Sequence, residues 1–290
     1  MTNRWIVGAR LRTLPAAVVP VVVGTAAAVG EPGDGIRCWR MVAALVVALA
    51  IQVATNYVND YADGVRGTDD VRVGPVRLVA SGLATPNEVR LAAGVAALVA
   101  AVAGLALAFA VGPEVLVVGV ACFLAGYFYT GGPKPYGYLG LGEVFVFVFF
   151  GLVATIGSCY VQLDRITGLA LGAAFPVGFL ATALLVVNNL RDIPTDVRTG
   201  KRTLAVRLGD GATRAAYVGL VVGAFAAVPL LALRRSWALL ALVAFVAALR
   251  PLGRIAKGAT GRTLIVVLGE TGRLQLAFGG LLALGLAVSG

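Results

Sequence analysis

Asn59-Asp60-Tyr61-Ala62-Asp63 stands at the end of one long apolar segment, and Asn188-Asn189-Leu190-Arg191-Asp192-Ile193-Pro194-Thr195-Asp196 stands at the end of another. The chain has only 14 Asp and Glu among 290 residues and is 59% hydrophobic, so acidic groups gathered at two segment ends need a reason. A carboxylate near hydrocarbon is costly unless it is paired, hydrogen-bonded or bound to a cation. The two clusters therefore predict one site at the edge of a helical membrane bundle.

Apolar segments of near-spanning length recur along the whole chain, and its mean hydropathy is +0.92. About 20 apolar residues suffice to cross the hydrocarbon core of a bilayer. A soluble protein of this composition would need an implausibly large dry core, so we expect an all-α integral membrane protein with one domain over residues 1–290. The expected transmembrane helices, about nine, lie at roughly 14–30, 38–58, 89–111, 113–129, 143–163, 166–187, 213–233, 236–250 and 272–289.

The positions of Lys and Arg predict the orientation in the cell membrane. With a cytoplasmic N-terminus, 19 of the 24 Lys and Arg fall in cytoplasmic segments, as the positive-inside rule requires. This asymmetry, with contacts to anionic lipid headgroups, accounts for much of the net charge of +10, and it does not imply nucleic acid binding. The chain has no histidine, and Cys38, Cys122 and Cys159 lack a metal-binding spacing, so no zinc site is expected.

Polar residues at the end of the second segment are spaced to share one face of a helix. They are Gln52, Asn56, Asn59 and Asp63, at intervals of four, three and four residues. Side chains at these intervals lie one above the other on a helix. The spacing predicts a first polar stripe.

A second stripe follows the sixth segment. Asn188, Asp192 and Asp196 are four residues apart, and Pro194 predicts a kink or a helix end within this stripe because proline lacks an N–H. The spacing Asn-x3-Asp also occurs at Asn59 and Asp63, 129 residues earlier. We interpret the chain as two related halves that meet at one site.

Two stripes facing a common space would bring together the carboxylates of Asp60, Asp63, Asp192 and Asp196. Charges of the same sign repel at such distances, and divalent cations resolve the conflict. Magnesium fits best, since it takes hard oxygen ligands from one or two carboxylates and from substrate phosphates. We expect two Mg²⁺ ions, with Asn59 as a further ligand. The alternative is that these residues only cap helix ends and bind water, but two matched clusters favour the metal and phosphate site.

Basic residues beside both clusters predict a diphosphate partner. Arg66 follows the first cluster, and Arg191, Arg198, Lys201 and Arg202 surround the second. Arginine can grip phosphate through two hydrogen bonds, and lysine acts on it as a point charge. Carboxylate, metal and diphosphate would then alternate in charge.

The region after the fourth predicted helix adds a loop and many aromatic rings. Lys134 lies in Thr130-Gly131-Gly132-Pro133-Lys134-Pro135-Tyr136, where glycines allow close approach of backbone to a ligand, although a topological lysine in a turn is an equal alternative. Ten of the 20 Phe and Tyr residues, Tyr129 among them, lie between Phe123 and Phe150. Helix packing or an interfacial belt explains some of them, and aromatic faces can also stabilise a carbocation.

With both clusters and their spacing in view, essentially the whole chain resembles the UbiA superfamily of intramembrane prenyltransferases. Its members are α-helical, carry N-D-x-x-D after the second helix and D-x-x-x-D after the sixth, and bind a polyprenyl diphosphate through magnesium. The matching stretches here are 59–63 and 192–196. Many members have a further Asp where this chain has Gly67, and Asp69 or Asp70 could replace it.

Three stretches, 10–17, 59–69 and 200–209, look most like the members that act on 1,4-dihydroxy-2-naphthoate. The resemblance implies transfer of a polyprenyl group from an allylic diphosphate to this aromatic acceptor with loss of carbon dioxide, a step of menaquinone biosynthesis. The residues expected to act in catalysis are Asp60, Asp63, Asp192, Asp196 and Lys134, and those expected to bind substrate are Arg12, Gln52, Asn56, Asn59, Arg66, Tyr129, Asn188, Lys201 and Arg202.

Three alternatives remain open at this point. A sister prenyltransferase would use 4-hydroxybenzoate, haem or a sugar phosphate as its acceptor. A CDP-alcohol phosphotransferase needs D-G-x-x-A-R with further spaced aspartates, of which residues 63–66 supply only a fragment. A cation-coupled transporter could also use paired halves, but it would need acids near the bilayer midplane, and here they lie at segment ends on one side.

Overall fold

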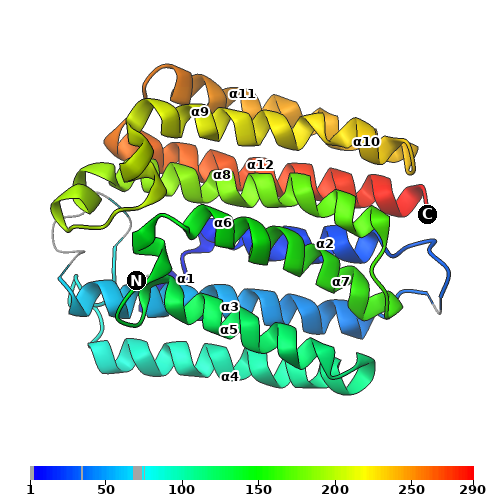
Figure 1. Cartoon of the computed structure of the whole chain (residues 1–290), viewed down its shortest axis with the longest axis horizontal. Coiled ribbons are helices and arrows are strands. Elements are labelled where there is room, and N and C mark those ends of the chain that lie inside the picture. Colours follow the sequence, from blue (N-terminus) through cyan, green and yellow to red (C-terminus); the bar gives the residue numbers. More distant parts are fainter. Residues whose placement is uncertain (1–2, 34, 68–73, 75) are drawn as a thin grey trace.

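The computed structural model describes residues 3–33, 35–67, 74 and 76–290, and every regular element in these ranges is helical. The long helices run side by side along the longest axis of the molecule (Figure 1). In chain order the elements are α1 (Arg4–Ala9), η1 (Leu11–Thr13), α2 (Pro15–Ala26), α3 (Cys38–Val65), α4 (Pro86–Val111), α5 (Glu114–Thr130), η2 (Tyr136–Leu139), α6 (Gly142–Val146), the π-helical η3 (Phe147–Val153), α7 (Ala154–Leu163), α8 (Gly168–Arg198), α9 (Leu204–Ala226), α10 (Val228–Ala232), η4 (Ser236–Ala244), α11 (Phe245–Ala256) and α12 (Gly261–Val288).

The expected count of about nine membrane spans is slightly too high. Within the described ranges, seven helices are long and apolar enough to cross a membrane. An eighth span results if the segments Arg4–Thr13 and Pro15–Ala26, which meet at a bend of 54°, are counted as one. The segment expected at 113–129 forms α5, which is apolar but has only 17 residues. All nine expected segments are therefore helical, and the difference concerns length.

Two helices continue beyond the ends that hydropathy predicts. The second expected segment stops at residue 58, but α3 continues to Val65, and α8 continues from the expected end at residue 187 to Arg198. Both polar clusters therefore lie within helices. Pro194 does not end α8, in contrast to one predicted outcome. A proline beyond the first turn removes one internal hydrogen bond but does not have to end a helix, and α8 also continues through a second proline, Pro176.

Helix α8 lies in the middle of the bundle, against α9, α12 and η3 (Figure 1). Small residues permit the close approach of η3 to α8. A Cβ atom on Gly151 would lie 2.5 Å from the Cα atom of Gly178, a distance at which one backbone must move. Membrane helices lack a hydrophobic driving force towards one another and associate through such close packing of small residues.

The two ends of the bundle differ. The connections at 131–135, 199–203 and 257–260 lie at the end that also holds the N-terminus, and the C-terminus lies at the opposite end (Figure 1). At that opposite end the buried Arg40 of α3 donates hydrogen bonds to the carbonyl oxygens of Val161 (2.7 Å) and Ala110 (2.8 Å). Arg40 thereby ties α3 to α4 and α7.

Candidate active site

A cavity of about 1240 Å³ runs through the bundle between α2, α3 and α5 on one side and α6, η3, α7 and α8 on the other. Polar side chains line its end near the N-terminal side of the molecule, and mostly apolar side chains line the rest. The wall from α6 to α7 contains the π-helical turn η3, and such turns are frequent at functional sites. The cavity therefore joins a polar chamber to an apolar channel.

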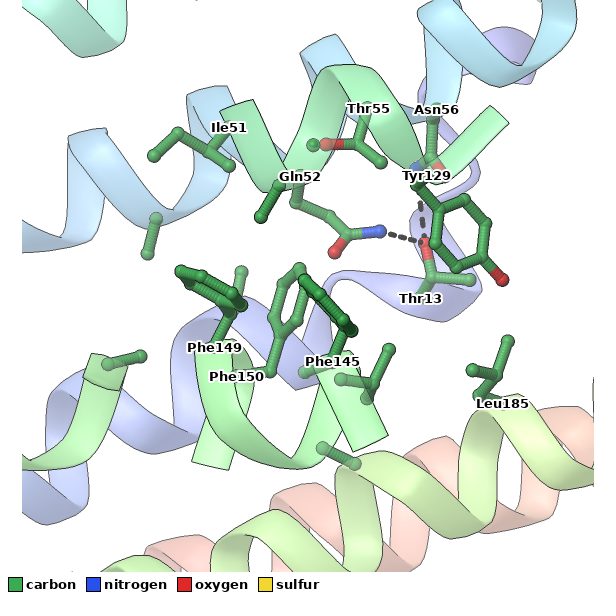
Figure 2. A pocket seen from close by; sticks show the side chains of 18 of the residues that line it. Thr13, Ile51, Gln52, Thr55, Asn56, Tyr129, Phe145, Phe149, Phe150 and Leu185 are labelled. Atoms are coloured by element: carbon green, nitrogen blue, oxygen red, sulfur yellow. Dashed lines mark hydrogen bonds between the residues drawn. The ribbon is translucent and has the colours of Figure 1, made fainter. Parts of the chain in front are cut away.

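The first predicted stripe faces this cavity along its full length. Gln52, Asn56, Asn59 and Asp63 are all buried and all line the cavity. Figure 2 shows the Gln52 and Asn56 side chains directed at Thr13, whose hydroxyl oxygen accepts from Gln52 Nε2 (3.1 Å) and Asn56 Nδ2 (3.2 Å). These bonds hold the bend between η1 and α2 against α3. Arg12, also predicted to bind substrate, lines the cavity at the same bend.

Asn59 and Asp63 occupy the polar end of the stripe. Asn59 Oδ1 accepts a hydrogen bond from the hydroxyl group of Thr130 at the end of α5. Asp63 Oδ1 accepts one from the Tyr138 hydroxyl (2.6 Å) and lies 2.9 Å from Lys201 Nζ. The Lys201 ammonium also lies 4.7 Å from the centre of the Tyr138 ring.

The electrostatic environment fixes the protons of this group. Burial alone would lower the pKa of Lys201, but the carboxylate of Asp63, helped by Tyr138 and Asp196, raises that pKa above its ordinary value. Burial raises the pKa of Tyr138, and the charge of Asp63 raises it further. Lysine therefore remains an ammonium and tyrosine remains a hydrogen-bond donor at neutral pH.

The second predicted stripe faces the same cavity from α8. Asn188, Asp192 and Asp196 all line it. Arg191 grips Asp192 through two hydrogen bonds of 2.8 Å and donates to Asn188 Oδ1 (2.9 Å), so it orients this stripe and does not itself line the cavity. The structure thus brings the two clusters together from helices far apart in the sequence.

The oxygen atoms that share the chamber suit a hard divalent cation. Asn59, Asp63, Asp192 and Asp196 contribute them. In the part of the chain that the structure describes, no three Asp, Glu, Cys or His side chains converge as a ready cation cage. An ion held here would therefore need oxygen ligands from a substrate as well, as magnesium usually does. Asp69 and Asp70, the possible replacements at the position of Gly67, lie outside the described residues.

Four predicted site residues lie away from the cavity. Asp60, fully buried, accepts from the backbone N–H groups of Leu78 (2.9 Å) and Val79 (3.0 Å). Arg66 donates to the carbonyl oxygens of Thr130 and Gly132. The side chains of Lys134 and Arg202 are exposed, and none of Asp60, Arg66, Lys134 and Arg202 lines the cavity.

Aromatic side chains form one wall of the channel beside the chamber. Tyr129, predicted to bind substrate, lines the cavity, and its ring meets that of Tyr136 edge to face at 5.5 Å. The ring of Tyr136 stacks on Phe145 at 3.8 Å. Phe149, which is labelled with Phe145 in Figure 2, follows at 5.9 Å from Phe145. The aromatic residues concentrated in this part of the sequence thus include four rings in contact, those of Tyr129, Tyr136, Phe145 and Phe149, next to the acidic stripes.

Three polar residues at the site were not predicted to act there, namely Glu143, Asn189 and Tyr138. Glu143 is 6% exposed and accepts a hydrogen bond from Asn189 Nδ2 (2.9 Å), and Asn189 lines the cavity. A carboxylate at the start of an otherwise apolar span is the signal that could have revealed Glu143, because such groups are rare in membranes and functional by default. Tyr138 had no comparable signal.

Comparison with known proteins gives consistent matches over most of the chain. The sequence profile of the UbiA prenyltransferase family matches residues 17–264. The chain is 49% identical to the 1,4-dihydroxy-2-naphthoate octaprenyltransferase of Mycobacterium tuberculosis over 275 residues, which cover 95% of this chain and 94% of that protein. It is 36% identical to the protein of the same name from Escherichia coli, over 77% of this chain and 74% of that protein.

Solved structures share the fold at low sequence identity. A UbiA homolog from Archaeoglobus fulgidus aligns over 99% of this chain and all of its own, with a TM-score of 0.69 and 12% identity. The same homolog bound to GPP and Mg²⁺ aligns with a TM-score of 0.64 over 97% of this chain and 99% of its own, again at 12% identity. By sequence profile, by relatives above 30% identity and by fold, this chain belongs to the UbiA prenyltransferase family.

Proposed function

We propose that this membrane enzyme transfers a polyprenyl group from an allylic diphosphate to 1,4-dihydroxy-2-naphthoate, with loss of carbon dioxide, as a step of menaquinone biosynthesis. The observation that carries the proposal is that two carboxylate stripes and a buried ammonium group line the polar end of a cavity whose remainder is apolar. One end suits a diphosphate with its cation, and the other suits an isoprenoid chain.

The reaction divides between the two ends of the cavity. The allylic C–O bond breaks and the diphosphate leaves with the electron pair. The ring carbon that bears the carboxylate then bonds to the allylic carbon, and carbon dioxide departs while its bonding electrons restore the aromatic ring. Lys201 supplies positive charge to the diphosphate, and the apolar walls keep water from the cation.

Magnesium, bound by Asn59, Asp63, Asp192 and Asp196 together with diphosphate oxygens, would neutralise the leaving group. The fit rests on the oxygen atoms of these four residues, which line one chamber. Arg191 holds Asp192 in its orientation. Asp60 is assigned to the backbone of residues 78 and 79. We propose that two Mg²⁺ ions bind in this chamber.

The apolar channel is the proposed site of the isoprenoid tail. It extends past Phe149 to Glu114 and Tyr160, which share a hydrogen bond of 2.8 Å at the far end. Substrate and product both carry long isoprenoid chains that belong in lipid, so a site inside a membrane bundle spares them the cost of transfer into water.

The orientation and the symmetry of the chain are also proposals. A cytoplasmic N-terminus in the cell membrane places the chamber on the cytoplasmic side, because the connections rich in Lys and Arg lie at the chamber end (Figure 1). The matched stripes on α3 and α8 support two related halves that meet at the cavity.

The acceptor is tested by product analysis with the purified full chain, an allylic diphosphate and magnesium. The panel contains 1,4-dihydroxy-2-naphthoate, 4-hydroxybenzoate, haem and a sugar phosphate. The proposal expects the prenylated and decarboxylated naphthalene diol as the main product. Efficient prenylation of 4-hydroxybenzoate with no naphthoate product would assign the chain to a sister reaction instead.

A further inference from the structure

The buried residues Glu143 and Asn189 have no part in the diphosphate site proposed above, yet Asn189 lines the cavity next to Asn188. Asn189 Nδ2 donates a hydrogen bond to Glu143 Oε1 at 2.9 Å. Glu143 is 6% exposed and Asn189 is 7% exposed. The second carboxyl oxygen, Glu143 Oε2, is buried without a hydrogen-bond partner. A partly satisfied acid in an apolar span is costly, so a purely structural tether is a poor use of it.

The hydrogen bond fixes which end of the Asn189 amide is available. An amide NH₂ group can only donate and an amide oxygen can only accept. One of the two amide N–H groups donates to Glu143 and sets the orientation of the amide, so the oxygen Oδ1 and the second N–H group are left for the cavity that Asn189 lines. In the described part of the chain, no residue donates a hydrogen bond to Asn189 Oδ1.

The surroundings of this pair fit a flat hydroxylated ring. Gly142, next to Glu143, lies against the hydroxyl edge of Tyr129, since a Cβ atom there would be 3.2 Å from ring Cε2 and 3.4 Å from the hydroxyl oxygen. The same Cβ atom would lie 3.5 Å from Leu185, one helical turn before Asn189. Figure 2 shows Tyr129 and Leu185 at the same end of the pocket, with Phe145 beside them. Aromatic and aliphatic side chains thus border the backbone next to Glu143, in the same cavity that Asn189 lines.

We propose that Asn189 Oδ1 accepts a hydrogen bond from a ring hydroxyl of the acceptor, and that Glu143 is the positioning residue that keeps the amide in this orientation. The inference rests on the proposed function, because it concerns the acceptor of that reaction. It assigns the selection of a hydroxylated ring to a pair that neither acidic motif contains. A site built to bond a substrate hydroxyl discriminates strongly against analogues that lack it.

The test is a double-variation cycle between enzyme and ligand. The two monomethyl ethers of 1,4-dihydroxy-2-naphthoate serve as competitive inhibitors of the full chain, so that their inhibition constants do not depend on turnover. We expect one ether to bind the unaltered protein about fivefold to tenfold more weakly than the parent diol, the size of one lost hydrogen bond. In Asn189→Leu the same methylation should change binding less than twofold, while the KM for the prenyl diphosphate stays unchanged.

Glu143→Gln tests the positioning role with a side chain of the same shape. Glutamine can donate as well as accept, so the Asn189 amide is free to turn, and the penalty for methylation should fall to about threefold. Ser158→Ala is the control, because Ser158 lines the cavity but its hydroxyl donates to Ala154 of its own helix, and it should retain the full penalty.

Equal penalties in the unaltered protein and in both variants would overturn the inference and leave a structural tether. A rise in the KM for the prenyl diphosphate that matches the loss of acceptor affinity would do the same. An unaltered protein that prenylates no naphthoate would instead overturn the proposed function.

Discussion

Lys201 and Asp63 are 138 residues apart in the sequence, and their charged atoms lie 2.9 Å apart at the polar end of the cavity. The pair joins the end of α3 to the connection after α8, so it links the two acidic clusters. Tyr138 completes it by donating to the same carboxylate oxygen. A cation that binds Asp63 would compete with Lys201 for this oxygen, and the ammonium group would then be available to a diphosphate.

We expect Asp63→Asn and Asp192→Asn each to lower turnover by at least about 100-fold, the range seen when one key electrostatic group is removed from an active site. Both carboxylates line the chamber, and an amide cannot replace their negative charge towards magnesium. The measurement is product formation at saturating substrate and magnesium.

Asp164→Asn is the matched control for these two variants. Asp164 lies at the opposite end of the bundle, exposed, with a φ of 55° that asparagine tolerates well. It should keep normal turnover. Near-normal activity in a well-folded Asp63→Asn protein, or full activity in excess chelator, would contradict the assignment of the chamber to magnesium.

Lys201→Met should raise the KM for the prenyl diphosphate by about tenfold or more, since a charge-assisted hydrogen bond to phosphate is worth about 1.5–3 kcal/mol. The double variant with Asp63→Asn should lose much less than the sum of the two single losses, because both residues act on one bound ligand. Lys257→Met is the control, since Lys257 is an exposed lysine at the same end of the bundle. Additive losses would return Lys201 to a role in orientation or lipid contact.

The polar stripes could be predicted because a membrane helix contains few polar residues, and their spacing alone fixes the face on which they lie. Asp60 shows where the argument from clustering is too coarse. Asp60 stands four residues after Asn56 and three before Asp63, so the spacing alone places it at the edge of the same stripe. Only the folded chain shows that its carboxylate bonds the backbone of Leu78 and Val79 and does not line the cavity.

The partners of the basic residues could not be predicted from local spacing. Arg66 follows the first cluster, yet it bonds carbonyl oxygens after α5, and Arg191 bonds its own neighbour Asp192. Both outcomes depend on how distant helices pack. Lys201 was predicted beside the second cluster, but only the folded chain brings it to Asp63 of the first.

The native Cys38 offers a test of orientation. Cys38 is exposed at the start of α3, at the end of the bundle away from the chamber. Ser81 is exposed in the connection between α3 and α4, at the chamber end. In intact cells, a membrane-impermeant maleimide should label the unaltered protein and fail to label Cys38→Ser. Ser81→Cys in the Cys38→Ser protein should react only after the membrane is permeabilised. Labelling of the residue at position 81 in intact cells would reverse the orientation.

Arg40→Leu should destabilise the fold by about 3 kcal/mol without changing the KM of either substrate. The substitution leaves the carbonyl oxygens of Ala110 and Val161 without their charged donor, and hydrogen bonds to charged groups contribute about 1.5–3 kcal/mol each. Thermal unfolding of the detergent-solubilised protein measures the effect. Arg234→Leu, which alters an exposed arginine at the same end of the bundle, should leave the midpoint unchanged. Equal midpoints for both variants would contradict the role assigned to Arg40.

Asp60→Asn separates a structural aspartate from a cation ligand within one motif. The asparagine oxygen can keep only part of the two hydrogen bonds to Leu78 and Val79, so we expect the free energy of unfolding to fall by about 1–2 kcal/mol. The affinity for magnesium with the prenyl diphosphate should change less than threefold, because Asp60 does not line the cavity. Asp63→Asn should show the opposite pattern, a large loss of that affinity. Calorimetric titration of the ligands and thermal unfolding of both variants measure the two quantities. A loss of ligand affinity in Asp60→Asn as large as that in Asp63→Asn would place Asp60 back among the cation ligands.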